Sequence, residues 1–194
     1  MNSTHPIILA SSSPRRQFLL REAGLSFKVV KPESDESFPA DMPPAQVAKY
    51  LASKKAEMFR LTIRDEVLIT ADTVVIHQDQ ILNKPADEAE AFEMLKKLSG
   101  KTHTVMTGVC LLSAEKEISF DDTSLVSFVA LNDEEIRYYI KNYKPFDKAG
   151  AYGAQDWIGM VGIEKIEGSY FNVMGLPMHR LYQELKKFGI HLNS

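Results

Sequence analysis

An almost unbroken apolar run, Val67–Ile76, is interrupted near its middle by one acid, Asp72. The residues on either side have the composition of a strand buried on both faces of a sheet. A carboxylate in such a strand needs a cation, a metal ion or water as its partner, because an isolated charge is costly to bury. A lone aspartate at a strand end, however, more often caps a turn. The run predicts a core strand and leaves both interpretations of its carboxylate open.

Further apolar runs alternate with segments of helical periodicity. Strands are expected at residues 7–10, 27–30, 67–71 with 74–76, 102–113 and 124–131. Helices are expected at 14–23, 45–61, 89–98, 133–140 and 177–188, from capping residues, prolines and spacings of i, i+3 and i+4. Residues 31–44 predict an exposed loop, 78–80 a hairpin turn, and 148–177 short segments separated by glycines. This mixture indicates an α/β protein with a mixed central sheet and flanking helices.

Length and charge narrow the class of protein. The 194 residues suffice for one domain, which we place over 1–194. A formal net charge of −3 gives no general basic surface for nucleic acid or an anionic membrane. The single cysteine, Cys110, excludes a disulfide within one chain and a cysteine zinc cluster, which suits a reducing cytoplasm. Neither a membrane helix nor an export signal is indicated.

The segment Ser11–Arg16 combines hydroxyl groups, a helix N-terminus and two guanidinium groups. Amide groups and the helix dipole at such an end favour anions, and Arg binds phosphate oxygens through paired hydrogen bonds. The segment lacks the glycines and lysine of a P-loop, and an ordinary capped helix with surface arginines explains it equally well. Because adjacent residues do not share one helix face, we expect one of Arg15 and Arg16 to meet a ligand and the other a structural carboxylate.

Several other polar groups are weak signals when taken singly. The loop acids Glu33, Asp35 and Glu36 could supply oxygen ligands to Mg²⁺ or could simply be solvated. Lys55 and Lys84 could neutralise phosphate charge or could face water.

The segment Lys148–Gln155 is rich in glycine and ends in an amide. Glycines allow close approach of the backbone, and the amide of Gln155 can both donate to and accept from the edge of a base. The alternative is a tight turn with a solvent-exposed glutamine.

Several of these segments occur together in one order. They are Leu9–Arg16, Ala71–Thr73, Lys84–Pro85, Leu98–Gly100, Asp147–Gln155 and Gly168–Pro177. In order and spacing they resemble the Maf family of nucleoside triphosphate pyrophosphatases, and the resemblance covers nearly the whole chain. It implies a fold similar to that of the inosine triphosphate pyrophosphatases, a mixed sheet with a cleft between two lobes. The family is also linked with inhibition of septum formation.

The resemblance further implies roles for individual residues. The implied catalytic set is Asp72, Lys55, Lys84 and Glu36, and the implied substrate-binding set is Ser11, Arg15, Arg16, Thr73 and Gln155. Within these sets Asp72 is the implied proton acceptor, and Asp72 and Glu36 are the implied ligands of a Mg²⁺ or Mn²⁺ ion.

Three positions bear on substrate choice. Arg15, Thr73 and Gln155 match the positions that mark the branch of the family acting on dTTP and UTP. The branch that prefers 7-methyl-GTP typically has Tyr after the Ser-Pro pair, which is absent here. After Gln155, residues 156–158 (Asp-Trp-Ile) replace the usual glycine-rich continuation, a departure that bears on fine substrate preference and not on the reaction.

The resemblance therefore implies hydrolysis of dTTP and UTP to the monophosphate and pyrophosphate. It implies a homodimer whose partner is a small-molecule nucleotide. The charge balance predicts that neither nucleic acid nor a membrane is a partner, and the cysteine usage predicts a cytoplasmic protein. One alternative is a non-catalytic nucleotide-binding regulator of septum formation, which has no use for Asp72 beside an α-phosphate because like charges repel. The other is a purine-directed pyrophosphatase on the same fold, which the residues at positions 15, 73 and 155 disfavour.

Overall fold

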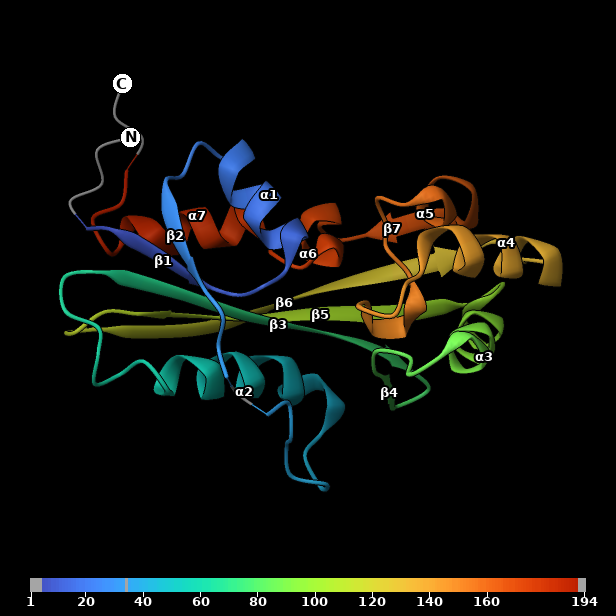
Figure 1. Cartoon of the computed structure of the whole chain (residues 1–194), viewed down its shortest axis with the longest axis horizontal. Coiled ribbons are helices and arrows are strands. Elements are labelled where there is room, and N and C mark those ends of the chain that lie inside the picture. The colour runs from blue at the N-terminus through green and yellow to red at the C-terminus, as the bar shows by residue number, and fades with distance from the viewer. Residues whose placement is uncertain (1–4, 34, 192–194) are drawn as a thin grey trace. The chain divides into compact units, whose positions relative to one another are not determined.

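The computed structural model of the chain describes residues 5–33 and 35–191, and Figure 1 shows its elements. Two compact units are distinguished. The first contains the described residues up to Asp72, Thr107–Asp122 and the described residues from Gly175 onward; the second contains Thr73–Met106 and Thr123–Met174. Within the described ranges no helix is long and apolar enough to cross a bilayer.

The strands form a mixed sheet, as the sequence predicted. The seven strands that are described pair in the order β2-β1-β3-β5-β6-β7, with β4 paired to β3. They are β1 (Ile7–Ala10), β2 (Phe27–Val30), β3 (Val67–His77), β4 (Gln80–Leu82), β5 (Thr102–Leu112), β6 (Glu117–Phe128) and β7 (Ile163–Glu167). β1 runs parallel to β2 and β3, whereas β4 and β7 run antiparallel to β3 and β6. By position in the chain, β3, β5 and β6 contribute residues to both units.

Helices cover both faces of the strands in the first unit. Figure 1 shows α2 (Pro44–Glu57) on one face and α1 (Pro14–Glu22) and α7 (Met178–Lys186) on the other. Parallel neighbours such as β1, β2 and β3 need crossover connections that pass over a face of the sheet. The helices α1 and α2 lie in those connections along the chain.

The helix α2 packs very closely on the sheet. A Cβ atom on Gly108 of β5 would lie 2.3 Å from the backbone of Ala48, so only glycine fits there. The hydroxyl of Thr70 on β3 donates to the Ala52 carbonyl over 2.7 Å. These contacts hold the backbone of α2 against the strands, and with it the lysines near the helix C-terminus.

The helix predicted over 45–61 ends earlier, at Glu57. Beyond it the chain forms turns, in which the Phe59 amide donates to the Ala56 carbonyl. Met58 and Leu61, which lie beyond the end of the helix, are 45% and 85% exposed. The apolar pattern therefore overstated the length of the helix.

The second unit has an apolar core of its own. Its helical elements are α3 (Glu88–Leu98), α4 (Asp133–Tyr143), the 3₁₀ turn η1 (Ala149–Ala151), α5 (Trp157–Gly162) and α6 (Tyr170–Met174). Fully buried Leu95, Leu98, Ile136 and Ile158 lie in this core.

Local signals in the second unit formed as the sequence predicted. The side chain of Asp87 accepts from the Glu90 amide at the start of α3, and Asn132 forms a complete capping box with Glu135 at the start of α4. Gln78 and Asp79 adopt φ angles of 49° and 60°, as a two-residue hairpin turn between β3 and β4 requires.

Other elements were not predicted with these bounds. The strand expected at 124–131 begins at Glu117, and α5, β7 and α6 lie where only short segments were expected. The buried amide of Asn172 on α6 donates to the Val105 carbonyl and to the Ser124 hydroxyl over 3.1 and 3.0 Å. These distant partners hold α6, which at 5 residues is too short to show a helical periodicity in the sequence.

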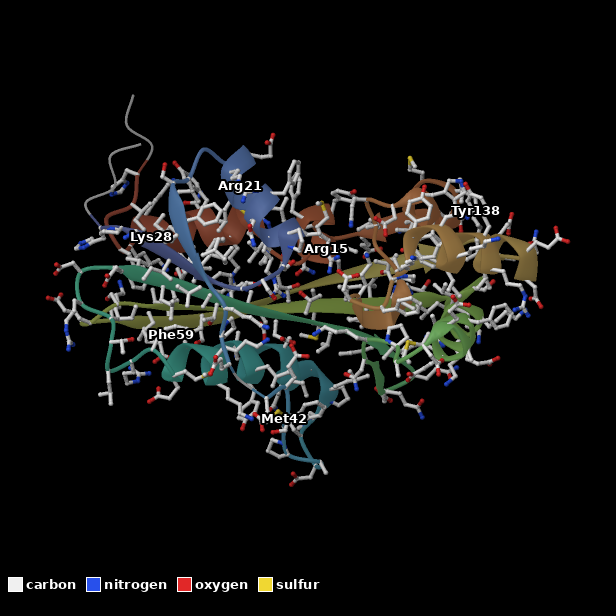
Figure 2. The ribbon with its side chains drawn as sticks, viewed as in Figure 1. Arg15, Arg21, Lys28, Met42, Phe59 and Tyr138 are labelled. Carbon is white, nitrogen blue, oxygen red and sulfur yellow. The ribbon has the colours of Figure 1, made fainter. Side chains whose placement is uncertain are left out.

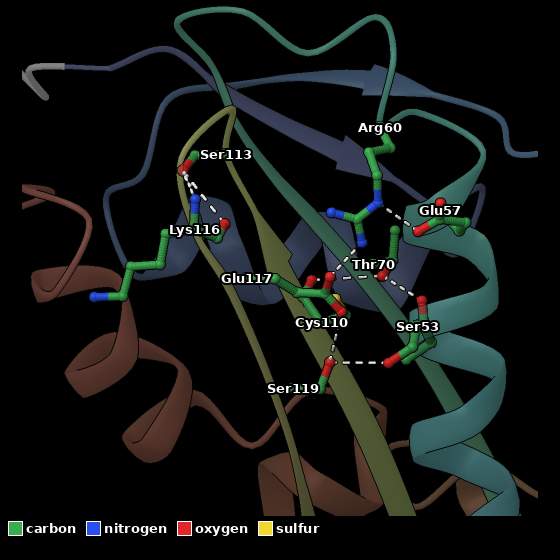
Figure 3. Close-up of polar contacts among 10 residues, drawn as sticks. Ser53, Glu57, Arg60, Thr70, Cys110, Ser113, Lys116, Glu117 and Ser119 are labelled. Carbon is green, nitrogen blue, oxygen red and sulfur yellow. Dashed lines mark hydrogen bonds and ion pairs between the residues drawn. The ribbon is translucent and has the colours of Figure 1, made fainter.

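A polar cluster in the first unit surrounds the cysteine (Figure 3). Arg60 donates to both Glu57 and Glu117, and the thiol of Cys110 donates to Glu117 over 3.6 Å. Burial raises the pKa of the Cys110 thiol to about 11. The thiol is therefore protonated near neutral pH, as befits a structural cysteine.

Candidate active site

The loop between β1 and α1 forms a polar turn around two serines. Ser13 caps α1, its side chain accepting from the Arg16 amide. The buried hydroxyl of Ser11 accepts from the Ser13 amide over 3.2 Å and from Nη1 of Arg16 over 3.3 Å. The predicted capped helix is confirmed, and Ser11 is held at its N-terminus.

Arg16 turns inward from α1 and bonds the main chain of distant segments. Its Nε donates to the Gly175 carbonyl and its Nη1 to the Ala71 carbonyl, each over 2.9 Å. Burial lowers the pKa of Arg16, and the charge of Asp72 partly opposes this effect. These bonds hold the strand immediately before Asp72.

Arg15 lies beside Arg16 on the first turn of α1 and is only half-buried. Figure 2 labels it together with Arg21 from the last turn of the same helix. Successive helical residues point about 100° apart, so Arg15 and Arg16 leave α1 in different directions.

Asp72 lies inside a continuous strand, β3, and is 8% exposed. The interpretation in which it ends a strand and caps a turn is therefore wrong. Its Oδ1 lies 2.5 Å from Nζ of Lys55, whose side chain is 8% exposed, and the same ammonium lies 3.4 Å from Oε1 of Glu36. Two carboxylates thus share one buried ammonium group, which supplies the cationic partner that a buried aspartate needs.

The acidic loop is positioned by the lysine next to Lys55. Nζ of Lys54 donates to the Ser37 carbonyl over 2.9 Å and forms an ion pair with Asp35. Hydrogen bonds from Lys54 and Ser37 lower the pKa of Asp35. Of the three loop acids, Glu33 is exposed and Asp35 forms an ion pair with Lys54. Glu36 lies between Asp35 and Ser37 in the chain, and its side chain contacts Lys55.

In the second unit, Lys84 lies in the segment after β4 and is exposed. The carbonyl of the preceding residue, Asn83, accepts from the Gly150 amide over 3.2 Å. The segment that carries Lys84 is therefore bonded to the glycine-rich segment that leads to Gln155. Thr73, the neighbour of Asp72 along β3, is half-buried.

The glycine-rich segment has an unusual backbone. Gly150 and Ala151 adopt φ angles of 67° and 60°, and a Cβ atom on Gly150 would lie 3.0 Å from Val75. Tyr152 is buried, and its hydroxyl lies 2.7 Å from Nε2 of His103. The segment is therefore packed against the core, unlike a free surface turn.

Gln155 is half-buried, and its Oε1 atom is buried without a hydrogen-bond partner in the part of the chain that the structure describes. The alternative of a solvent-exposed glutamine is thus wrong. Tyr139 adjoins this turn, since its hydroxyl accepts from the Gly153 amide over 3.1 Å. Sequence reasoning missed Tyr139, because a tyrosine in the apolar stripe of a helix gives no sign of what its hydroxyl contacts.

The predicted site residues are divided between the units. Ser11, Arg15, Arg16, Glu36, Lys55 and Asp72 belong to the first, and Thr73, Lys84 and Gln155 to the second. Within the first unit, Asp72, Lys55 and Glu36 are in direct contact. Among residues 5–33 and 35–191, no group of three or more His, Cys, Asp or Glu side chains could hold a metal ion.

Comparisons with known proteins show what this chain is similar to. The family model described as Maf-like protein matches residues 6–188. A dTTP/UTP pyrophosphatase of Parabacteroides distasonis is 49% identical over 186 residues, which are 95% of this chain and 96% of that protein. One of Phocaeicola vulgatus is 50% identical over 185 residues, covering 94% and 96%. The solved Ham1 protein of Staphylococcus aureus has a TM-score of 0.50 at 14% identity, covering 94% of this chain and 99% of that chain, a likeness of fold.

Proposed function

Because the chain belongs to the Maf-like protein family, we propose that it is a nucleotide pyrophosphatase that hydrolyses dTTP and UTP to the monophosphate and pyrophosphate. The names of the relatives reported above support this choice of substrate. The observation that carries the proposal is the buried contact of Asp72 with Lys55, which also reaches Glu36. A carboxylate set into a core strand and paired with an ammonium group suits proton transfer next to a phosphate.

In the proposed reaction, water attacks the α-phosphorus atom and the bond to the β-phosphate bridging oxygen breaks. Asp72 accepts the proton of the attacking water. Because Lys55 engages Oδ1, we assign this role to Oδ2. Pyrophosphate leaves with the bridging oxygen, and the monophosphate retains the oxygen that came from water.

Phosphate charge would be met by cationic and hydroxyl groups. Lys55, Lys84 and Arg15 would stabilise negative charge that develops on the phosphates. Ser11 would donate its hydroxyl hydrogen to a phosphate oxygen. Arg16 would act mainly by holding the strand before Asp72, because two of its donors bond main-chain carbonyls.

The two acidic side chains fit a divalent cation. Mg²⁺ is usually held by one or two carboxylates together with substrate phosphates and needs no complete protein cage, and Asp72 and Glu36 approach one another through the shared Lys55. We propose that these two residues hold Mg²⁺ or Mn²⁺, which would supply charge neutralisation on the phosphates.

Gln155 would recognise the base. Uracil and thymine present an N3–H donor between two carbonyl acceptors. The buried, unpartnered Oε1 of Gln155 could accept the N3–H, and its Nε2 could donate to a carbonyl. Thr73 would assist substrate binding from its position beside Asp72.

We further propose a cytoplasmic homodimer that binds free nucleotides, with neither nucleic acid nor a membrane as partner. The net charge of −3 supports the exclusion of polyanions. The family model extends over residues of both units, which supports one Maf-like domain over 1–194.

The direct test is Asp72→Asn, which preserves shape and removes the proton acceptor. Pyrophosphate release from UTP and dTTP, assayed with Mg²⁺ and with Mn²⁺, should be abolished while the folded structure persists. Asp79→Asn is the matched control, since Asp79 lies in the hairpin turn at φ 60°, which Asn tolerates. Near wild-type release by a folded Asp72→Asn variant would remove the proton-acceptor assignment, whereas a wild-type protein that binds UTP and dTTP without releasing pyrophosphate would favour a nucleotide-binding regulator of septum formation.

A further inference from the structure

The turn that carries Gln155 is organised by one buried hydroxyl group. The Tyr139 side chain from α4 is fully buried. Its oxygen accepts from the Gly153 amide over 3.1 Å and donates to Oδ2 of Asp156 over 2.7 Å. Gly153 and Asp156 are the two ends of the turn, and the Asp156 amide also donates to the Gly153 carbonyl over 3.0 Å. Tyr139 therefore bonds both ends of the turn, and Gln155 lies between them.

The side chain of Asp156 is committed to this contact. Asp156 precedes α5 at the N-cap position, where an aspartate usually accepts from amides of its own helix. Here it makes no such bond and accepts from Tyr139 instead. Lys148 lies 3.8 Å from the same oxygen. Burial, together with donation to Asp156, raises the pKa of the Tyr139 hydroxyl, so it remains a donor.

Gln155 is in turn packed against the bonded turn. A Cβ atom on Gly153 would lie 2.7 Å from Oδ2 of Asp156 and 2.9 Å from Nε2 of Gln155. The amide nitrogen thus lies against Gly153, and the carbonyl oxygen is buried at the other end of the amide without a partner among the described residues. Packing at one end of the amide and burial at the other restrict its rotation.

One amide orientation distinguishes two pyrimidines of equal size. Uracil has an N3–H donor where cytosine has an N3 acceptor, and uracil has a carbonyl where cytosine has an amino group. A glutamine free to rotate could satisfy either base by exchanging its oxygen and nitrogen ends. A glutamine held in one orientation satisfies only one of them.

We propose that Tyr139, acting through Asp156 and Gly153, is a positioning residue that holds Gln155 in the orientation that selects uracil and thymine over cytosine. This inference rests on the proposed function, because it assigns base recognition to Gln155. A merely structural role would lower activity toward all substrates alike, whereas a positioning role changes the ratio of kcat/KM for UTP to that for CTP.

The test compares kcat/KM for UTP and CTP in the wild type and in Tyr139→Phe. Removal of the hydroxyl should lower the UTP to CTP ratio by roughly tenfold, through a rise in KM for UTP and a smaller change for CTP. Tyr143→Phe is the matched control, because Tyr143 stacks on Tyr139 at 5.2 Å and is 38% exposed. It should leave the ratio unchanged.

Two variants at Asp156 keep the inference testable if Tyr139→Phe does not fold. Asp156→Ala removes the acceptor and should lower the ratio as Tyr139→Phe does. Asp156→Asn retains an oxygen that can accept the hydroxyl and should keep most of the preference. An unchanged ratio in both Tyr139→Phe and Asp156→Ala would overturn the inference.

Failure of the proposed function gives a different result. A wild-type protein that releases no pyrophosphate from UTP or dTTP would overturn the proposed function and the inference that rests on it. An active wild type that hydrolyses UTP and CTP equally well would leave the pyrophosphatase assignment standing and overturn the inference alone.

Discussion

Nζ of Lys55 lies 2.5 Å from Oδ1 of Asp72, and both side chains are almost entirely buried. The two residues come from different elements, α2 and β3. A buried ion pair is costly to break by removing one partner, because the other charge then remains without compensation. This pair therefore affects stability as well as chemistry.

We expect Lys55→Met to lower the free energy of unfolding by about 3 kcal/mol, because the Asp72 carboxylate loses its ammonium partner. The double variant Lys55→Met/Asp72→Asn should recover part of this loss, since neither buried group is then charged. Urea unfolding of the single and double variants measures the coupling free energy between Lys55 and Asp72. Lys54→Met is the control, because Lys54 pairs with the well-exposed Asp35 and should cost less than about 1 kcal/mol. Additive losses would contradict the prediction.

Substitution of the two adjacent arginines should give different results. Arg15→Ala should raise KM and lower kcat together, with kcat/KM reduced roughly ten- to hundredfold by loss of a charge-assisted contact to phosphate. Arg16→Ala should lower the free energy of unfolding by about 2 kcal/mol or more, because the Ala71 and Gly175 carbonyls lose their donor. Steady-state kinetics and urea unfolding of both variants check this. Unchanged kinetics in Arg15→Ala would return that residue to an ordinary surface role.

Gln155→Glu should weaken pyrimidine preference. The variant replaces the amide donor by a carboxylate and leaves a base carbonyl unpaired and facing a negative charge, a loss of ~1 to 3 kcal/mol. The values of kcat/KM for UTP and dTTP should fall roughly ten- to hundredfold, while that for GTP, whose ring N–H groups suit a carboxylate, falls less or rises. Parallel shifts for all three nucleotides would show that Gln155 does not contact the base.

Stability should depend on pH through His103. Burial lowers its pKa from 6.5 to about 4, with a smaller effect from His77. The unfolded chain therefore binds more protons between these two values, so the free energy of unfolding falls as pH is lowered through this window. Through His103, the free energy of unfolding should be about 2 kcal/mol lower at pH 5 than at pH 7.

His103→Phe should flatten this dependence between pH 7 and pH 5, although loss of the bond to Tyr152 lowers stability at both values. Urea unfolding at both pH values gives the change in the free energy of unfolding with pH. His191→Gln, at an exposed position, is the control. Equal slopes in wild type and His103→Phe would assign the acid sensitivity to other groups.

Several features follow from local sequence alone. Ser13 and Asn132 cap their helices, and the pair at 78–79 forms its hairpin turn, because each signal acts between residues a few positions apart. The strand that contains Asp72 was recognisable from its apolar neighbours. The order and spacing of the motifs also indicated the family, which the comparisons confirm.

The tertiary structure decided which groups meet. Nothing near Arg16 in the sequence specifies that its donors bond the Ala71 and Gly175 carbonyls. The same holds for Asn172, which bonds Val105 and Ser124. Such contacts join segments far apart in the chain, and periodicity and capping rules report only on neighbours within a few residues. Candidate site residues could be proposed from the sequence, whereas the ammonium group shared by Asp72 and Glu36 depends on the packing of α2 against the sheet.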